Sequence, residues 1–222
     1  MKRIFLILSI TAALQSSCDV SDTNAKKDDL QNDKIEESEK YHTLGLELYD
    51  KGHYKEAIKN YDKAIELFNR HEVALLNRGN AKDELGDYEG SVKDYSRAIQ
   101  IRPDMGMAYF NRALIKETKL QDSIGALEDY EMTIQVDPSY QGVFFNYGLL
   151  LHNLNRHKDA IKNFETHLKY YGQDDFAFFY IAKSYFALSD SKKGYNFLDK
   201  SISLGNPLAI DLKNKLAKPK LN

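Results

Sequence analysis

Few side chains in this sequence of 222 residues could carry chemistry. There is one cysteine, Cys18, and none of the six histidines stands at the spacing of a His-Glu-x-x-His metal helix. The sequence also lacks a glycine-rich phosphate loop and a Gly-x-Ser-x-Gly nucleophile elbow. We therefore expect no catalytic residue, no metal site, no cofactor and no small-molecule substrate.

Cys18 directly follows an apolar segment at the N-terminus. Residues 1–3 form a short basic head, residues 4–14 are apolar over about the length of a signal-peptide core, and Ser16 and Ser17 precede the cysteine. A lone thiol can form neither an internal disulfide nor a thiolate metal cluster. A basic head, an apolar core and small residues at a cut site are the parts of a secretory signal. Here a cysteine would be the first residue after the cut.

This arrangement resembles the signal of bacterial lipoproteins, although Gln15 occupies the position of the apolar residue in their cleavage motif. The resemblance implies that residues 1–17 are removed and that Cys18 is lipidated. The protein would then be anchored by lipid in a membrane of the bacterial cell envelope, facing the periplasm or the cell surface. Two other interpretations stay open: an ordinary cleaved signal peptide with an incidental cysteine, or an uncleaved membrane anchor.

The segment behind the cysteine is strongly polar. Leu30 and Ile35 are nearly the only apolar side chains between residues 19 and 38. Such a segment cannot bury enough apolar surface to offset the entropy of ordering it. We therefore expect residues 18–37 to form a disordered tether that carries the lipidated cysteine.

Beyond the tether, one pattern recurs at intervals of about 34 residues. Its second half is an amphipathic helix with a small residue, an aromatic residue and usually a second small residue. This half appears as AIKNYDKAI from Ala57, SVKDYSRAI from Ser91, ALEDYEMTI from Ala126 and AIKNFETHL from Ala160. A single helix pair of this kind cannot bury its apolar face alone, so neighbouring pairs must stack.

These residues resemble the tetratricopeptide repeat. The resemblance implies an all-α fold, a right-handed α-solenoid of about five helical hairpins with a C-terminal capping helix. We expect an array over residues 38–206, followed by a capping helix and tail over residues 208–222. Its repeats are expected near residues 38–71, 72–105, 106–140, 141–174 and 175–207.

The small and aromatic residues of the pattern have complementary roles in packing. Small residues such as Gly45 and Gly79 let two antiparallel helices approach closely. The aromatic residues of the second helices are expected to fill the gap to the next pair. They are Tyr61, Tyr95, Tyr130 and Phe164.

The resemblance also implies a scaffold that binds a partner protein or peptide through a concave groove lined by the first helix of each repeat. An apolar stripe is expected to face this groove: Leu76, Met107, Phe110, Phe145, Phe176 and Phe179. Such a stripe indicates a partner with apolar side chains. Alternatively, these side chains belong to the core, because an apolar stripe at helical spacing is often buried.

Asparagines recur beside this stripe. Asn77, Asn111 and Asn146 occupy the same position in successive repeats. Their amides could pair with the backbone of a bound peptide. They could equally join adjacent repeats to one another.

The charge pattern argues against nucleic-acid binding. The net charge is −2, and lysine and arginine alternate with aspartate and glutamate without forming a basic stripe. The predicted function is a membrane-anchored, non-catalytic adaptor that binds a protein or peptide through its concave groove. One alternative is a structural subunit of an envelope complex that makes contacts through its convex face or its ends. Another is an accessory factor of an enzyme that acts on the cell envelope or peptidoglycan.

Overall fold

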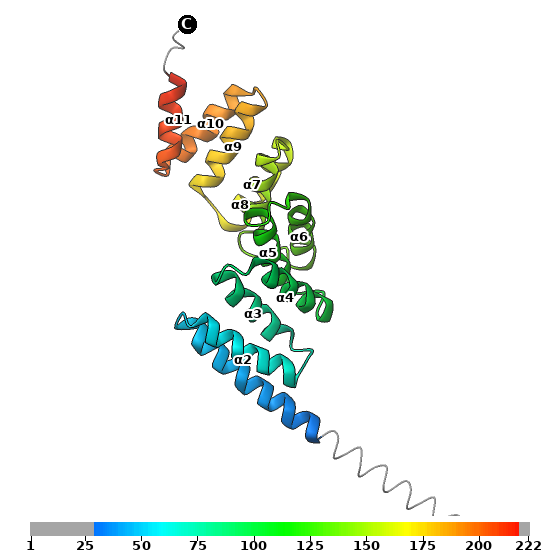
Figure 1. Ribbon diagram of the computed structural model, residues 1–222. Coiled ribbons are helices and arrows are strands. Elements are labelled where there is room, and N and C mark those ends of the chain that lie inside the picture. The colour runs from blue at the N-terminus through cyan, green and yellow to red at the C-terminus, as the bar shows by residue number, and fades with distance from the viewer. Residues whose placement is uncertain (1–28, 218–222) are drawn as a thin grey trace, which may run out of the picture. The chain divides into compact units, whose positions relative to one another are not determined.

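The computed structural model describes residues 29–217, in which every regular element is a helix (Figure 1). The chain divides into two compact units, Met1–Ile101 and Arg102–Asn222. The predicted signal segment and Cys18 lie outside the described residues. Among the helices that are described, none is both long and apolar enough to cross a membrane.

The first unit consists of two helical hairpins. A helix over residues 29–50 pairs with α2 (Tyr54–Leu67), and α3 (Glu72–Glu84) pairs with α4 (Tyr88–Ile101). Gly52 has a φ of 76° and lies in the turn that reverses the chain before α2. A residue with a side chain rarely adopts this backbone conformation, which explains the glycine.

The first helix begins earlier than the sequence predicted. Residues 29–37, which we assigned to the tether, are helical. Glu36 pairs with Lys40 one turn later at 3.0 Å, and pairs of this spacing stabilise a helix. Ser38 is fully buried, and its hydroxyl donates to the carbonyl of Ala64 in α2 at 2.8 Å. Residues 29–37 are almost all exposed, so pairing along the helix and continuity with the packed part that begins at Ser38 order a segment whose composition alone indicates disorder.

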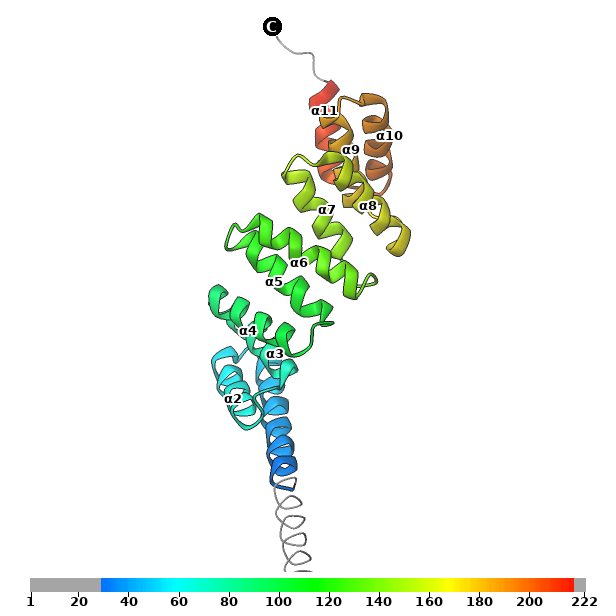
Figure 2. The same cartoon turned by 90° about the vertical axis from the view of Figure 1, so that its right-hand side faces the viewer.

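The second unit continues the alternation of helices. It contains α5 (Gly106–Thr118), α6 (Ser123–Val136), α7 (Val143–Asn153), α8 (His157–Tyr171), α9 (Asp175–Ala187), α10 (Ser191–Ser203) and α11 (Pro207–Ala217). The hairpins are α5 with α6, α7 with α8, and α9 with α10, and α11 packs against α10 (Figure 2). The five hairpins of the described residues and the terminal helix confirm the predicted all-α fold.

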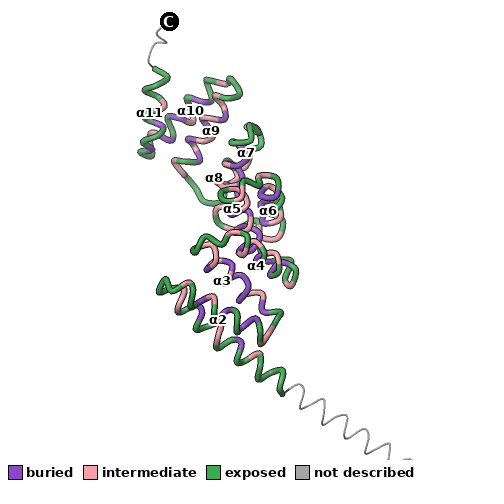
Figure 3. The backbone as a smooth tube through the Cα atoms, in the orientation of Figure 1, coloured by how far each residue is buried: buried purple, intermediate pink, exposed green. Residues whose placement is uncertain are grey.

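The core of each of the first four hairpins holds an aromatic ring packed against a small residue, whereas the fifth has the fully buried Leu198 at this position. Tyr61, Tyr95, Tyr130 and Phe164 are all at most 1% exposed. A Cβ atom at Gly79 would lie 2.6 Å from the ring of Tyr95, so these two helices can approach this closely only at a glycine. This confirms the predicted close approach at the small residues. The ring of Tyr95 fills space within its own hairpin, whereas Phe164 also reaches the next pair, where it stacks on Tyr180 of α9. Buried residues accordingly lie where paired helices meet (Figure 3).

A buried aspartate precedes the core tyrosine in two of the hairpins, and the sequence analysis did not identify it. Asp94 accepts hydrogen bonds from Nε of Arg78 at 2.8 Å and from Nη2 of Arg78 at 2.5 Å, and Lys82 lies 2.8 Å away. The same arrangement recurs in the second unit with Asp129, Arg112 and Lys116. The repeated Asp-Tyr pair, with an arginine and a lysine in the preceding helix, was a visible signal of these networks.

Candidate peptide-binding site

A pocket of about 400 Å³ lies within the second unit. Phe145 and Leu149 of α7 and Phe176 and Tyr180 of α9 form its apolar walls. Gln141, Gly142, His167 and Asp174 complete the lining. Two of the residues predicted to face the groove, Phe145 and Phe176, therefore meet in one concave site.

The starts of the two helices position these walls. Gly142 precedes α7 with a left-handed φ of 85°. Asp174 caps α9, because its Oδ1 accepts a hydrogen bond from the backbone N–H of Ala177 at 2.7 Å. Phe145 and Phe176 both lie in the first turns of these helices, so the two caps determine where their rings stand.

The buried ring of Phe164 packs behind two of the aromatic side chains that line the pocket. Phe164 is fully buried and meets Phe145 edge-on, with ring centroids 5.6 Å apart. Phe164 also stacks on Tyr180 at 5.8 Å. Aromatic pairs in these two geometries are favourable. Two walls of the pocket thus rest on one core side chain and are held in place before any ligand arrives.

One edge of the pocket is polar. Nε2 of His167 lies 3.4 Å from Oδ2 of Asp174, and the His167 side chain is only 10% exposed. Nδ1 of His167 is buried and has no hydrogen-bond partner within residues 29–217. The pocket therefore combines an apolar surface with a polar edge formed by His167 and Asp174.

The predicted stripe divides into exposed and buried members. Met107 and Phe176 are 45% and 44% exposed, and Phe145 is half-buried. Leu76, Phe110 and Phe179 are less than 10% exposed. Phe110, for example, packs against the rings of Tyr130 and Tyr140. For these three side chains the structure favours the core interpretation, which the sequence had left open.

The amides of the recurring asparagines are used within the fold. Nδ2 of Asn77 lies 2.9 Å from Nε2 of His42, which joins α3 to the helix over residues 29–50. Asn146 donates to the carbonyl of Gly142 at 3.0 Å, at the start of its own helix. Asn111 is half-buried and is also engaged in an interaction. These contacts favour a structural role for Asn77 and Asn146.

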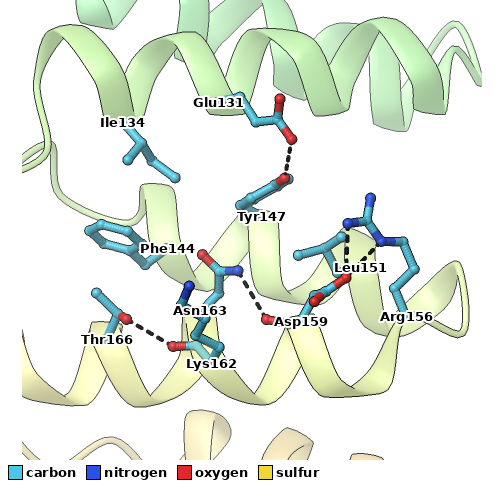
Figure 4. Close-up of a pocket in the computed structure, with 10 residues that line it drawn as sticks. All are labelled: Glu131, Ile134, Phe144, Tyr147, Leu151, Arg156, Asp159, Lys162, Asn163 and Thr166. Carbon is cyan, nitrogen blue, oxygen red and sulfur yellow. Dashed lines mark hydrogen bonds and ion pairs between the residues drawn. The ribbon is translucent and has the colours of Figure 1, made fainter.

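A second pocket of about 360 Å³ lies among α6, α7 and α8 (Figure 4). Its polar side chains other than that of Lys162 bond to one another or to nearby backbone. The hydroxyl of Tyr147 donates to Glu131 at 2.5 Å, and Arg156 pairs with Asp159 at 2.8 Å. These side chains would have to give up existing bonds to receive a ligand, so the pocket between α7 and α9 is the better candidate.

His152 lies near the end of α7 and joins that helix to α9. Its Nδ1 is 2.8 Å from the hydroxyl of Ser184, which is fully buried. Burial lowers the pKa of His152 to about 4, and Lys183 and His157 act in the same direction. The imidazole is therefore neutral at neutral pH, which suits a hydrogen bond between helices.

Comparisons with known proteins agree with this architecture. The tetratricopeptide repeat model matches residues 38–71 and 73–105. No curated protein matches the chain by sequence. The crystal structure of MamA protein is 16% identical with a TM-score of 0.71, over 84% of this chain and 99% of that one.

Two further solved structures are similar. YrrB, described as a TPR protein with an unusual peptide-binding site, is 20% identical with a TM-score of 0.70, over 78% of this chain and 90% of its own. MamA from Desulfovibrio magneticus RS-1 is 17% identical with a TM-score of 0.68, over 76% of this chain and 94% of its own. At these identities the likeness shows the fold, and function has to be argued from the site.

Proposed function

We propose that this chain, which carries tetratricopeptide repeats at residues 38–71 and 73–105, is a non-catalytic scaffold that binds an apolar segment of a partner protein. The observation that carries the proposal is the pocket between α7 and α9, with the half-exposed ring of Phe176 at its wall. A concave, mostly apolar site with a few polar groups is typical of ligand-binding pockets. The peptide-binding site named for YrrB supports the same class of function.

The lining of the pocket specifies the chemistry of the segment. An apolar side chain of the partner would enter between Phe145 and Phe176, and aromatic anchors of this kind often dominate binding energy. A backbone or side-chain polar group of the partner would face the polar edge formed by His167 and Asp174. A short extended or helical segment would meet both requirements.

A peptide-display selection on the full chain tests this proposal. We expect the selected peptides to share an apolar residue and to lose more than about tenfold in affinity when Phe176 is changed to aspartate. The charge would stand in the apolar wall, whereas folding should tolerate it because the side chain is 44% exposed. Isothermal titration of each peptide with each variant gives the comparison.

Ile124→Asp is the matched control, since Ile124 is 74% exposed on α6 and does not line the pocket. Peptides that bind both variants equally well would contradict the proposed site. Peptides that lose affinity only for Ile124→Asp would place the contact elsewhere on the second unit. Circular dichroism should show that both variants remain folded.

We further propose that the scaffold is a lipid-anchored protein of the bacterial cell envelope. The support is the sequence around Cys18, in which a basic head, an apolar core and small residues precede the single cysteine. A polar segment between Cys18 and the first described helix would hold the hairpins away from the membrane.

Mass spectrometry of the native N-terminus tests the anchor. We expect a chain that begins at Cys18 and carries acyl groups, together with a Cys18→Ser variant that lacks them and leaves the membrane fraction. A chain that retains Met1, or one that begins at an unmodified residue after the signal, would contradict lipidation.

A further inference from the structure

The first unit holds a cluster of potential metal ligands that uses none of the pocket residues. Glu39 and His42 lie one turn apart on the helix over residues 29–50, and His71 precedes α3. One donor atom from each of the three side chains can be chosen so that all lie within 4.8 Å of one another. The chain separation between His42 and His71 matches no metal-binding motif, so only the folding of the first hairpin onto α3 brings them together.

The Glu39 carboxylate lies between the two imidazoles. Its Oε1 is 3.5 Å from Nε2 of His71, and its Oε2 is 3.6 Å from Nδ1 of His42. Both distances exceed those of ordinary hydrogen bonds. Within residues 29–217 the buried Nε2 of His71 makes no hydrogen bond, although its side chain is only 5% exposed. A polar atom this deeply buried normally has a partner.

A metal ion would supply that partner. We propose that Glu39, His42 and His71 bind one divalent transition-metal ion of the Zn²⁺ class. Bonds of about 2.0–2.2 Å in a tetrahedral shell place neighbouring donor atoms about 3.3–3.6 Å apart. Each oxygen of the Glu39 carboxylate is near this separation from one imidazole nitrogen, and a single oxygen has to approach both nitrogens when the ion binds. Two imidazoles and one carboxylate favour Zn²⁺ over Mg²⁺ or Ca²⁺, which prefer oxygen ligands.

The surroundings of the histidines are compatible with this role. Nδ2 of Asn77 lies 2.9 Å from Nε2 of His42. Coordination through Nδ1 of His42 places the ring proton on Nε2, which would then donate to the amide oxygen of Asn77 after that amide turns over.

Binding would change one contact of His71. Its Nδ1 accepts a hydrogen bond of 3.3 Å from the backbone N–H of Ala74. Coordination through Nε2 places the ring proton on Nδ1, so this long bond would be exchanged for the bond to the metal. With three protein ligands, the fourth position stays available to water or to a donor atom of a bound partner.

Titration of the untagged, chelator-treated full chain with ZnCl₂ tests the proposal by calorimetry. We expect one equivalent to bind and the melting temperature to rise, since a ligand that binds only the folded state stabilises it. Glu39→Gln and His71→Asn should each weaken binding by more than about tenfold. Glu39→Gln preserves the size of an exposed side chain, and asparagine keeps a hydrogen-bond acceptor at the start of α3.

His53→Asn is the matched control. His53 stands at the equivalent position before α2, is exposed and makes no side-chain cap bond, so its loss should leave the titration unchanged. The proposal is overturned if the wild-type chain binds no stoichiometric Zn²⁺. It is equally overturned if both ligand variants bind as tightly as the wild type, or if His53→Asn alone abolishes binding.

Discussion

Replacing Asp129 by alanine should lower the free energy of unfolding by about 3–5 kcal/mol. The carboxylate is 4% exposed and bonds to Nε and Nη2 of Arg112 at 2.8 and 2.6 Å. Nζ of Lys116 lies 2.8 Å from it. Without the aspartate, two cations that are themselves less than one-fifth exposed would lose their shared counter-ion. An uncompensated charge in such a position is costly, because the surrounding protein solvates it poorly.

Chemical denaturation followed by circular dichroism measures this effect, and hydrogen exchange in α5 and α6 localises it. The control is Asp159→Ala, which removes a carboxylate from an ion pair with Arg156 in the same unit. Both side chains of that pair are about half exposed, so its loss should cost less than about 1 kcal/mol. Equal losses in the two variants would show that burial of the Asp129 network contributes nothing.

Truncating Phe164 to alanine should cost about 3–5 kcal/mol, the range observed for large buried aromatic residues. The ring is fully buried and contacts Phe145 and Tyr180. The glycine opposite it, Gly148, has no side chain that could fill the cavity. The variant should also lose affinity for peptides selected on the wild-type chain, because two walls of the pocket rest on this ring.

Tyr170→Ala is the control for this change. Tyr170 lies in α8, as Phe164 does, and stacks on Phe144 with ring centroids 5.6 Å apart. Unlike Phe164, it is 52% exposed. Its removal should cost less than about 1.5 kcal/mol and leave peptide affinity unchanged. If Phe164→Ala remains as stable as the wild type but no longer binds peptide, the ring would have a direct role in binding that its burial does not explain.

The helical hairpins were predictable because the relevant information is local. A small residue such as Gly79 and a ring such as Tyr95 lie within one repeat, and their contact depends on two neighbouring helices alone. The spacing of apolar residues determines which face of each helix is buried. The repetition of this pattern was sufficient to predict stacked hairpins and the rings of their core.

The candidate sites were predictable only in part. Phe176 and Phe179 are neighbours in one helix and both belonged to the predicted groove, yet the first is 44% exposed and the second 7%. Their exposure depends on the side chains that other helices bring against them. For the same reason, the sequence could not decide whether Asn77 faces a peptide or His42.

The sequence by itself determined the fold class and the close packing at small residues, while the signal before Cys18 stays a prediction. These features follow from residue type and spacing along a short stretch of chain. The tertiary structure decided that residues 29–37 are helical, which apolar side chains line a pocket, and that Glu39, His42 and His71 meet. Each of these outcomes depends on contacts between helices, and burial and ligand geometry are properties of the packed hairpins rather than of any one segment.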